Sequence, residues 1–174
     1  EPYRRQRQMC IRDRVLPVEI GKIKYLETLV IYGNTNTSLL PSPYRIGNAL
    51  AELKYLKNLT ISALGITTID KNELKEPCKV LRTLDVSGNN FTSIPYDLTP
   101  TNYPELLNLS LTGNRRYSSI TDLSTETRDN PGLRIDASSS SFKNLLKWEK
   151  LKSLSLSYNL IYGQLPTCLL YTSD

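Results

Sequence analysis

A nine-residue pattern, L-x-x-L-x-L-x-x-N, recurs along the chain and constrains its fold more than any other feature. Four copies fit it closely: LETLVIYGN from Leu26, LRTLDVSGN from Leu81, LLNLSLTGN from Leu106 and LKSLSLSYN from Leu151. Two weaker copies, LKNLTISAL from Leu56 and NPGLRIDAS from Asn130, fill the gaps, so that ninth positions follow one another at intervals of 21 to 30 residues. Units this short cannot bury a core alone, and neighbouring copies must therefore stack.

Apolar and polar residues alternate within each copy over the length of a short strand. Leu84 and Val86, for example, lie on either side of Asp85. This period of two predicts a strand with one buried and one exposed face. We expect the strands of successive copies to pair side by side, so that their apolar faces form one continuous core.

The pattern resembles that of the leucine-rich repeat family, and the resemblance covers essentially all of residues 15–167. It implies an α/β solenoid of about six repeats, with a parallel β-sheet on the concave face. Short helical, 3-10 or irregular crossings would form the convex face. The stretches LPVEIG and NLIYGQLP further resemble the plant-type branch of the family, which is common in extracellular receptors and inhibitors.

An asparagine closes each of the four close copies. The side-chain amide of asparagine can both donate and accept, so it can pair backbone groups that a buried turn would otherwise leave unsatisfied. The two weaker copies end on Leu64 and Ser138, and we expect irregular turns there, with Gly65 helping the chain to turn after Leu64. The predicted turn residues are Asn34, Asn89, Asn114 and Asn159.

The crossings between copies show a different spacing. Ile20 and Ile23 lie three residues apart, as do Phe142, Leu145 and Trp148. This is the period of a short helical or 3-10 turn. It predicts that Trp148 packs in the core rather than stacks on a ligand.

The outward side chains of the predicted strands are small, polar and mostly neutral. Members of the family generally bind partners on the concave face, so the resemblance makes these side chains the candidate site. Hydroxyl groups suit hydrogen bonds to a peptide or glycan, but they are also common on exposed strands that bind nothing. The candidate partner-binding residues are Tyr32, Thr60, Asp85, Ser87, Ser110, Thr112, Arg134, Asp136, Ser155, Ser157 and Tyr158.

Three of these candidates are charged and two are aromatic. Tyrosine is over-represented among the residues that dominate binding energy, which favours Tyr32 and Tyr158. Arg134 and Asp136 are two residues apart on one predicted strand, so they could pair with each other instead of with a partner.

The residue content argues against catalysis. The chain has no histidine, which excludes histidine-based acid and base chemistry, Ser-His triads and histidine metal ligands. Cys78, the one cysteine of residues 15–167, has no evident base beside it and is expected to be a structural thiol. No phosphate-binding glycine loop is present. We expect no enzymatic activity, no cofactor and no metal site.

The two ends of the chain differ from the repeats. A single DNA sequence can encode both ends of the chain. One strand of it encodes residues 4–13, and the complementary strand, read in the appropriate frame, encodes residues 168–174. That DNA resembles a transposase-type sequencing-library adapter, so we expect residues 1–14 and 168–174 to be artefacts. The alternative is a genuine basic arm that binds nucleic acid or acidic membranes. Cys10 and Cys168 lie within these ends. If the ends are artefacts, these two cysteines give no information about the redox compartment of the protein.

The remaining charge is modest. Five arginines against Glu1 and Asp13 give residues 1–14 a net charge of +3, and Asp174 contributes −1, so residues 15–167 keep +3 of the total +5. Such a balance predicts no nucleic-acid partner, and no apolar run approaches the length of a membrane span. We therefore expect no membrane contact from this segment.

The expected function is non-catalytic recognition of a protein or peptide, with a glycan as a further partner. The chain would be a fragment of a larger protein such as a receptor ectodomain. The alternative is an intracellular scaffold or sensor segment, with or without a catalytic domain beyond these residues. The plant-type stretches favour an extracellular or cell-surface location. Triplets for N-glycosylation at Asn36, Asn58, Asn90 and Asn108 do not establish export, because this composition produces such triplets by chance.

Overall fold

The structure is a computed structural model that describes residues 15–33, 44–113 and 133–164. Two of the predicted turn residues, Asn34 and Asn114, lie outside the described residues. So do both segments that we expect to be artefacts, 1–14 and 168–174.

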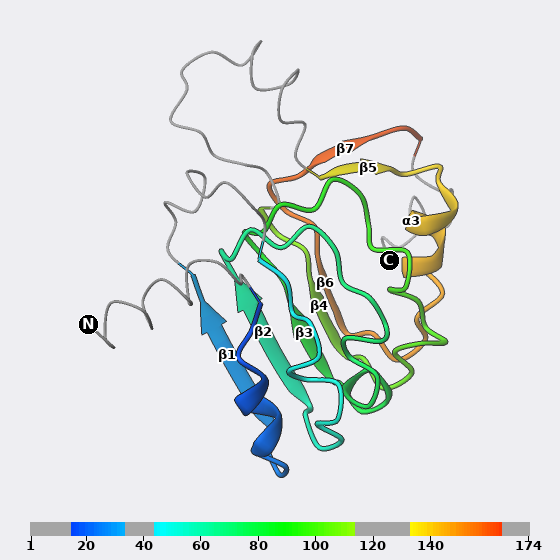
Figure 1. Cartoon of the computed structure of the whole chain (residues 1–174). Helices are drawn as coiled ribbons and strands as arrows, with labels where there is room; N and C mark the ends of the chain where they lie inside the picture. Colours follow the sequence, from blue (N-terminus) through cyan, green and yellow to red (C-terminus); the bar gives the residue numbers. More distant parts are fainter. Residues whose placement is uncertain (1–14, 34–43, 114–132, 165–174) are drawn as a thin grey trace, which may run out of the picture.

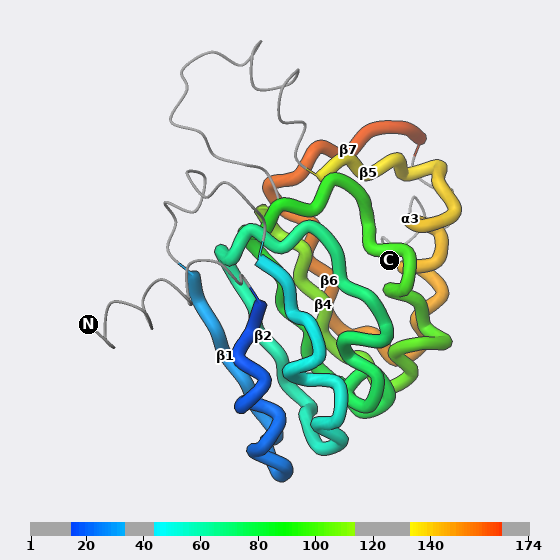
Figure 2. Tube along the Cα trace, in the orientation of Figure 1, coloured from blue at the N-terminus to red at the C-terminus, as the bar shows by residue number. Residues whose placement is uncertain are grey.

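Five short strands form a parallel sheet. They are β1 (Thr28–Tyr32), β2 (Asn58–Ser62), β3 (Thr83–Asp85), β4 (Asn108–Ser110) and β6 (Ser153–Ser155), in that order across the sheet. Pairing joins equivalent repeat positions, with Leu84 opposite both Leu59 and Leu109. The tube in Figure 2 shows successive turns of the chain lying side by side, and the sheet of Figure 1 runs across all of them. The predicted solenoid with a parallel sheet is confirmed.

The core lies between the sheet and the crossings. On β2, β3 and the residue that follows β3, the inward side chains Leu59, Ile61, Leu84 and Val86 are fully buried, while the intervening side chains are half-exposed. On β1 at the edge of the sheet, the inward side chains are only half-buried. Burial is therefore complete only where a repeat has described neighbours on both sides, as the stacking argument requires.

Backbone hydrogen bonds repeat with the same period. The carbonyl oxygen of Arg82 accepts from the N–H groups of both Leu107 and Asn108, at 2.8 and 2.9 Å. The equivalent carbonyl of Leu107 accepts from Lys152 and Ser153 in the same way. The repeat that holds β6 therefore stacks directly on the repeat that holds β4.

The crossings contain short helices. The 3-10 helices η1 (Val18–Lys22) and η3 (Pro77–Lys79) precede β1 and β3, and α3 (Ser140–Leu145) precedes β6. The hydroxyl of Ser139 caps α3 by accepting from the N–H of Phe142 at 3.2 Å. Trp148 is buried, and its indole N–H donates to the carbonyl of Tyr103 at 3.0 Å. The prediction that Trp148 packs in the core is confirmed.

The copy predicted from Asn130 does not join the main sheet. Residues Arg134–Asp136 form β5, which pairs in parallel with β7 (Leu160–Tyr162) in a separate two-stranded sheet. In Figure 1 this pair lies apart from the five-stranded sheet, on the side of the molecule that carries α3. The prediction that Arg134 and Asp136 lie on the concave face is therefore wrong.

The physical reason is that β5 lies in a crossing. β7 begins directly after the turn at Asn159, and β5 is its partner from the preceding turn of the solenoid. Leu133 and Ile135 are buried, so the stretch has the alternating pattern of a sheet strand. Alternation reports only that one face is buried, and it does not say which sheet the strand joins.

Candidate binding face

The outward side chains of the five-stranded sheet form one continuous surface, which we call the open face. Strand alternation places these residues on the side of the sheet opposite the core. Asp85 is the one charged residue among these positions in the described part of the chain. The open face consists of Thr28, Val30, Tyr32, Asn58, Thr60, Ser62, Thr83, Asp85, Ser87, Asn108, Ser110, Thr112, Ser153, Ser155 and Ser157.

The rim of this face is held by Asn89, which follows β3 and is 1% exposed. Its side-chain amide nitrogen donates to the carbonyls of Ile61 and Val86 at 2.7 and 2.9 Å. Its side-chain oxygen accepts from the N–H groups of Leu64 and Ile66 at 3.1 and 3.3 Å. One buried amide thus pairs backbone groups of two successive repeats. At the last described turn, Asn159 donates to the carbonyls of Leu111 and Leu156 in the same manner.

The turn at Leu64, where the repeat lacks an asparagine, is stabilised by the next repeat. Asn89 supplies the acceptor for the N–H of Leu64, and both Ala63 and Gly65 adopt positive φ angles, of 56° and 72°. Ala63 is therefore a non-glycine residue in the left-handed region, which L-residues rarely adopt. Ser138 follows β5 rather than a strand of the main sheet, and its N–H and hydroxyl both donate to Asp136.

Hydroxyl groups from three neighbouring strands form a hydrogen-bonded row on the open face. The Ser87 hydroxyl contacts Asp85 Oδ1 on one side and the Ser110 hydroxyl, 2.8 Å away, on the other. Ser110 contacts Thr112 at 3.0 Å, and Thr112 contacts Ser155 at 2.6 Å. We call Asp85, Ser87, Ser110, Thr112 and Ser155 the hydroxyl ladder.

A second row crosses the sheet at the beginning of the strands. The amide of Asn58 donates to the Thr28 hydroxyl at 3.2 Å, and the amide of Asn108 donates to the Thr83 hydroxyl at 3.3 Å. Both asparagines belong to glycosylation triplets, and these contacts hold their side chains against the sheet.

Comparison with known families matches two of the repeat units. A family model described as Leucine Rich Repeat matches residues 80–100 and 150–171. The first match contains β3 and Asn89, and the second contains β6 and Asn159. Over these two stretches the chain is similar to leucine-rich repeats, and the parallel-sheet solenoid is consistent with that family. No curated protein matches it. The second match also runs into residues 168–171, within the segment expected to be an artefact.

The structure separates the candidate residues of this leucine-rich repeat solenoid into three places. Ser87, Ser110, Thr112 and Ser155 come together with Asp85 in the hydroxyl ladder. Thr60 lies beside them on β2, and Ser157 follows β6 at the rim.

The two candidate tyrosines do not meet. Tyr32 ends the edge strand β1 and is 71% exposed, whereas Tyr158 follows β6 at the opposite edge and is 73% exposed. Four interstrand spacings, about 19 Å, separate those edges. One small ligand could not contact both side chains.

Arg134 and Asp136 lie on β5, away from the open face. Asp136 is the acceptor of a local turn, in which the hydroxyl and the N–H of Ser138 hold the pKa of this carboxyl below its ordinary value. Asp85 has the same local arrangement with Ser87, whose N–H donates to Asp85 Oδ1 at 3.0 Å. Only the Asp85 turn continues into a hydroxyl ladder among the described residues.

Sequence reasoning missed part of this arrangement. Ser62, whose hydroxyl donates to the carbonyl of Ser87 at 2.8 Å, was not a candidate, and neither were Asn58 and Asn108. The contact between Thr112 and Ser155 could not be expected either, because a strand was predicted between theirs. The available signal was the recurrence of Asn at the start of β2 and β4 and of hydroxyl residues at one register position.

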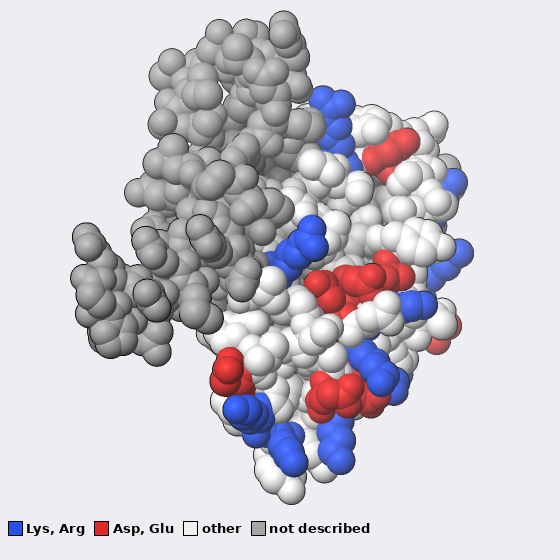
Figure 3. Space-filling view, viewed as in Figure 1, with Lys and Arg blue, Asp and Glu red and all other residues white. Residues whose placement is uncertain are grey.

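Charged side chains gather on other surfaces of the molecule. In the view of Figure 3, acidic and basic side chains are interspersed rather than collected by sign. Several are paired, including Lys79 with Glu76 at 3.0 Å and Lys150 with Glu105 at 2.6 Å. On this face the charges of the described residues are therefore partly balanced by neighbours of opposite sign.

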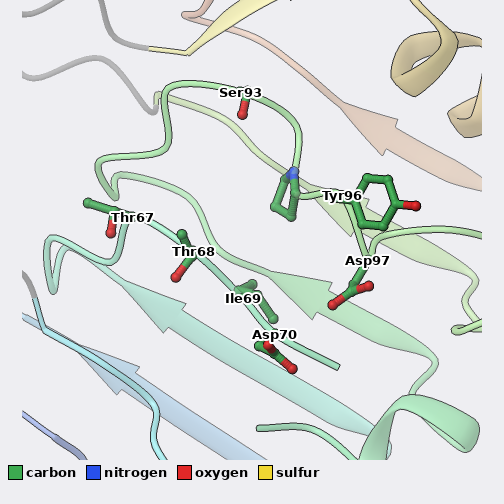
Figure 4. Close-up of a pocket in the computed structure, with 8 residues that line it drawn as sticks. Thr67, Thr68, Ile69, Asp70, Ser93, Tyr96 and Asp97 are labelled. Carbon is green, nitrogen blue, oxygen red and sulfur yellow. The ribbon is translucent and has the colours of Figure 1, made fainter. Parts of the chain in front are cut away.

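A hollow of about 370 Å³ lies between two successive crossings (Figure 4). Asp70 and Asp97 line it, but both carboxylates already accept backbone N–H groups, from Asn72 at 2.6 Å and from Lys71 at 3.1 Å. Tyr96, at its margin, is 91% exposed. The hollow therefore joins structural turns and is open to solvent.

Cys78 has the surroundings of a structural thiol. Its side chain is buried and donates to the carbonyl of Lys75 at 3.4 Å, and burial raises the pKa of the thiol. A raised pKa lowers the thiolate fraction that a nucleophile needs.

Within residues 15–33, 44–113 and 133–164, no group of acidic, cysteine or histidine side chains is arranged to hold a metal ion. The same residues include no helix of the length and apolarity needed to span a bilayer.

Proposed function

We propose that the chain is a non-catalytic recognition module that binds a protein or peptide on its open face. The observation that carries this proposal is the continuous outward surface of five paired strands, whose side chains are accessible and, apart from Val30 and the ring of Tyr32, polar. Leucine-rich repeats suggest a protein-interaction module, and an interface needs many groups positioned on a rigid support. The parallel sheet supplies that support.

The open face is a better candidate than the crossings. Its side chains hydrogen-bond mainly to one another, so their geometry is fixed before a partner arrives, which lowers the entropic cost of binding. On the crossings, by contrast, Asp70 and Asp97 are engaged in backbone turns and several lysines in surface ion pairs.

Panning a library of random dodecapeptides against the whole chain tests this proposal. Thr60→Arg places a long side chain on the open face, and Thr68→Arg places the same side chain on an exposed crossing. We expect the enriched peptides to lose about tenfold or more in affinity for the first variant. Their affinity for Thr68→Arg should stay within about twofold. Equal loss in both variants, or loss in Thr68→Arg alone, would refute the open face as the binding site.

We further propose that the chain is a fragment of a receptor ectodomain and that residues 1–14 and 168–174 derive from adapter DNA. The stretches LPVEIG and NLIYGQLP support the first statement, and the inverted coding relation between the two ends supports the second. Amplifying the source gene from inside residues 26–156 and sequencing outward tests both. A signal peptide and a membrane span in the new flanks would support the receptor. An uninterrupted reading frame for a cytosolic protein would contradict the receptor proposal. Codons for residues 4–13 in the source gene would contradict the adapter proposal.

A further inference from the structure

The hydroxyl ladder ends on a carboxylate, and this gives every hydrogen bond in it a direction. An ionised carboxylate can only accept, so the Ser87 hydroxyl must donate to Asp85. A serine hydroxyl has one hydrogen, and that of Ser87 is now committed.

The same reasoning extends across the sheet. Because Ser87 has no hydrogen left, Ser110 must be the donor in the contact between them, which is 2.8 Å long. Thr112 must then donate to Ser110, and Ser155 must donate to Thr112. All four hydroxyl hydrogens therefore point along the ladder toward Asp85. Nearby, the hydroxyl hydrogen of Ser62 is also committed, to the carbonyl of Ser87.

What the ladder can still offer to a ligand is acceptor capacity. Each hydroxyl oxygen has two lone pairs, of which Ser87, Ser110 and Thr112 each use one for the neighbouring hydroxyl. The remaining lone pairs have no committed donor within the ladder. These side chains and Asp85 are half-exposed, so solvent or a ligand can reach them.

A ligand that matches this surface must bring donors. Backbone and amide groups bring as many acceptors as donors, whereas the lysine ammonium and arginine guanidinium groups bring donors only. The charge of the open face points the same way, because Asp85 is its one charged residue in the described strands. The chain as a whole carries +5, so attraction for a cation would come from this site and not from the overall field.

We infer that the hydroxyl ladder is a subsite for a lysine or arginine side chain of a peptide ligand, with the cationic group at Asp85 and its donors on the hydroxyl oxygens. This inference rests on the proposed function, since it names the ligand chemistry of the same face. From β3 to β6 the ladder spans two interstrand spacings, about 10 Å. That length accommodates one extended cationic side chain or two neighbouring ones.

Three synthetic probes test the inference. They are glycine–serine dodecapeptides with blocked ends that carry, at the same two central positions, arginine, glutamine or glutamate. Titration of the whole isotope-labelled chain, followed by NMR chemical shifts, measures weak dissociation constants and locates the contact. We expect the arginine peptide to shift the amide signals of Ser87 and Ser110. Its Kd should be about tenfold or more below that of the glutamine peptide, and the glutamate peptide should bind weakest.

Two aspartate variants form a matched pair. Asp85→Asn and Asp136→Asn remove the same charge from the same kind of local turn, one on the ladder and one on β5. The Kd of the arginine peptide should rise about tenfold in Asp85→Asn and stay within about twofold in Asp136→Asn. Ser110→Ala keeps the charge of Asp85 but removes one hydroxyl of the ladder. If Asp85→Asn fails to fold, this variant still tests whether the ladder binds the arginine peptide. In Ser110→Ala we expect a rise of about threefold or more.

The outcomes separate the two levels of the proposal. An arginine peptide that binds no better than the glutamine peptide, or that binds equally well to wild type, Asp85→Asn and Ser110→Ala, would overturn the inference. If library-selected peptides still lost affinity for Thr60→Arg, the proposed function would stand without it. If Thr60→Arg changed nothing, the proposed function itself would fall.

Discussion

The side-chain amide of Asn89 donates a 2.7 Å hydrogen bond to the carbonyl oxygen of Ile61, which lies 28 residues earlier in the chain. This contact joins the rims of two successive repeats. Asn89 also accepts from the N–H groups of Leu64 and Ile66, so the order of the open face at β2 depends on a residue of the following repeat.

Replacing Asn89 by alanine should lower the free energy of unfolding by about 3 kcal/mol, because buried backbone donors and acceptors lose their partner. Urea denaturation followed by circular dichroism measures the change. Asn159→Ala is the control, since Asn159 is only half-buried and lies at the last described turn. It should cost about 1 kcal/mol. Equal costs at the two positions would show that the interior site has no special role.

Trp148 is the one tryptophan of the chain, and its buried indole N–H donates to Tyr103. Trp148→Phe should therefore reduce stability by about 2 kcal/mol, because the ring is smaller and the carbonyl of Tyr103 keeps only its longer hydrogen bond from the N–H of Leu106, at 3.4 Å. In the wild type, Trp148 emission should be blue-shifted and move to longer wavelength together with the loss of circular dichroism in urea. A red-shifted native emission would mean that Trp148 is exposed to water.

Gly163 tests the pairing of β5 with β7. A Cβ atom at Gly163 would lie 2.6 Å from Asp136 Oδ1, whereas one at Gly113 would meet nothing within 4 Å. Both glycines have positive φ, of 87° and 63°, so alanine at either position costs about 1 kcal/mol in backbone strain. Gly163→Ala should cost more than Gly113→Ala, because the Asp136 carboxylate must move away from the new methyl group and weaken its hydrogen bonds from Ser138. Similar thermal stabilities of the two variants would argue against the observed contact between β7 and Asp136.

The ion pair between Glu105 and Lys150 predicts a pH dependence. The hydrogen bond from Lys150, with its charge, holds the pKa of Glu105 below its ordinary value of 4.5. A lowered pKa means that folding favours the ionised form, so this contribution to stability is present above pH 4.5 and disappears as the pH falls through the folded-state pKa.

Glu105→Gln should accordingly have a lower urea midpoint than the wild type at neutral pH. The two midpoints should converge at about pH 2. Both side chains are exposed, so the difference should be small and should shrink in 1 M salt, where the Debye length is about 3 Å. A difference that persists at low pH would contradict an electrostatic origin.

Much of the fold could be predicted because the information is local. Alternation placed Leu84 and Val86 inside and Asp85 outside, and the spacing of Phe142, Leu145 and Trp148 indicated a helical crossing with a buried tryptophan. The prediction that residues 134–136 belong to the main sheet was wrong because strand pairing is not determined by local sequence. A strand of three residues with one buried face fits either sheet, and only its neighbours decide between them.

The same distinction between local sequence and long-range pairing applies to the candidate site. The repeat period, the inward leucines and the polar, nearly uncharged character of the open face could be predicted from the sequence alone, because each depends on residues a few positions apart. The pairing of β6 with β4 and the separate position of β5 could be found only from the folded chain, since that pairing joins segments 45 residues apart, as Asn108 and Ser153 are. That pairing brings Ser155 to Thr112, and with it the hydroxyl ladder acquires both its length and its direction toward Asp85.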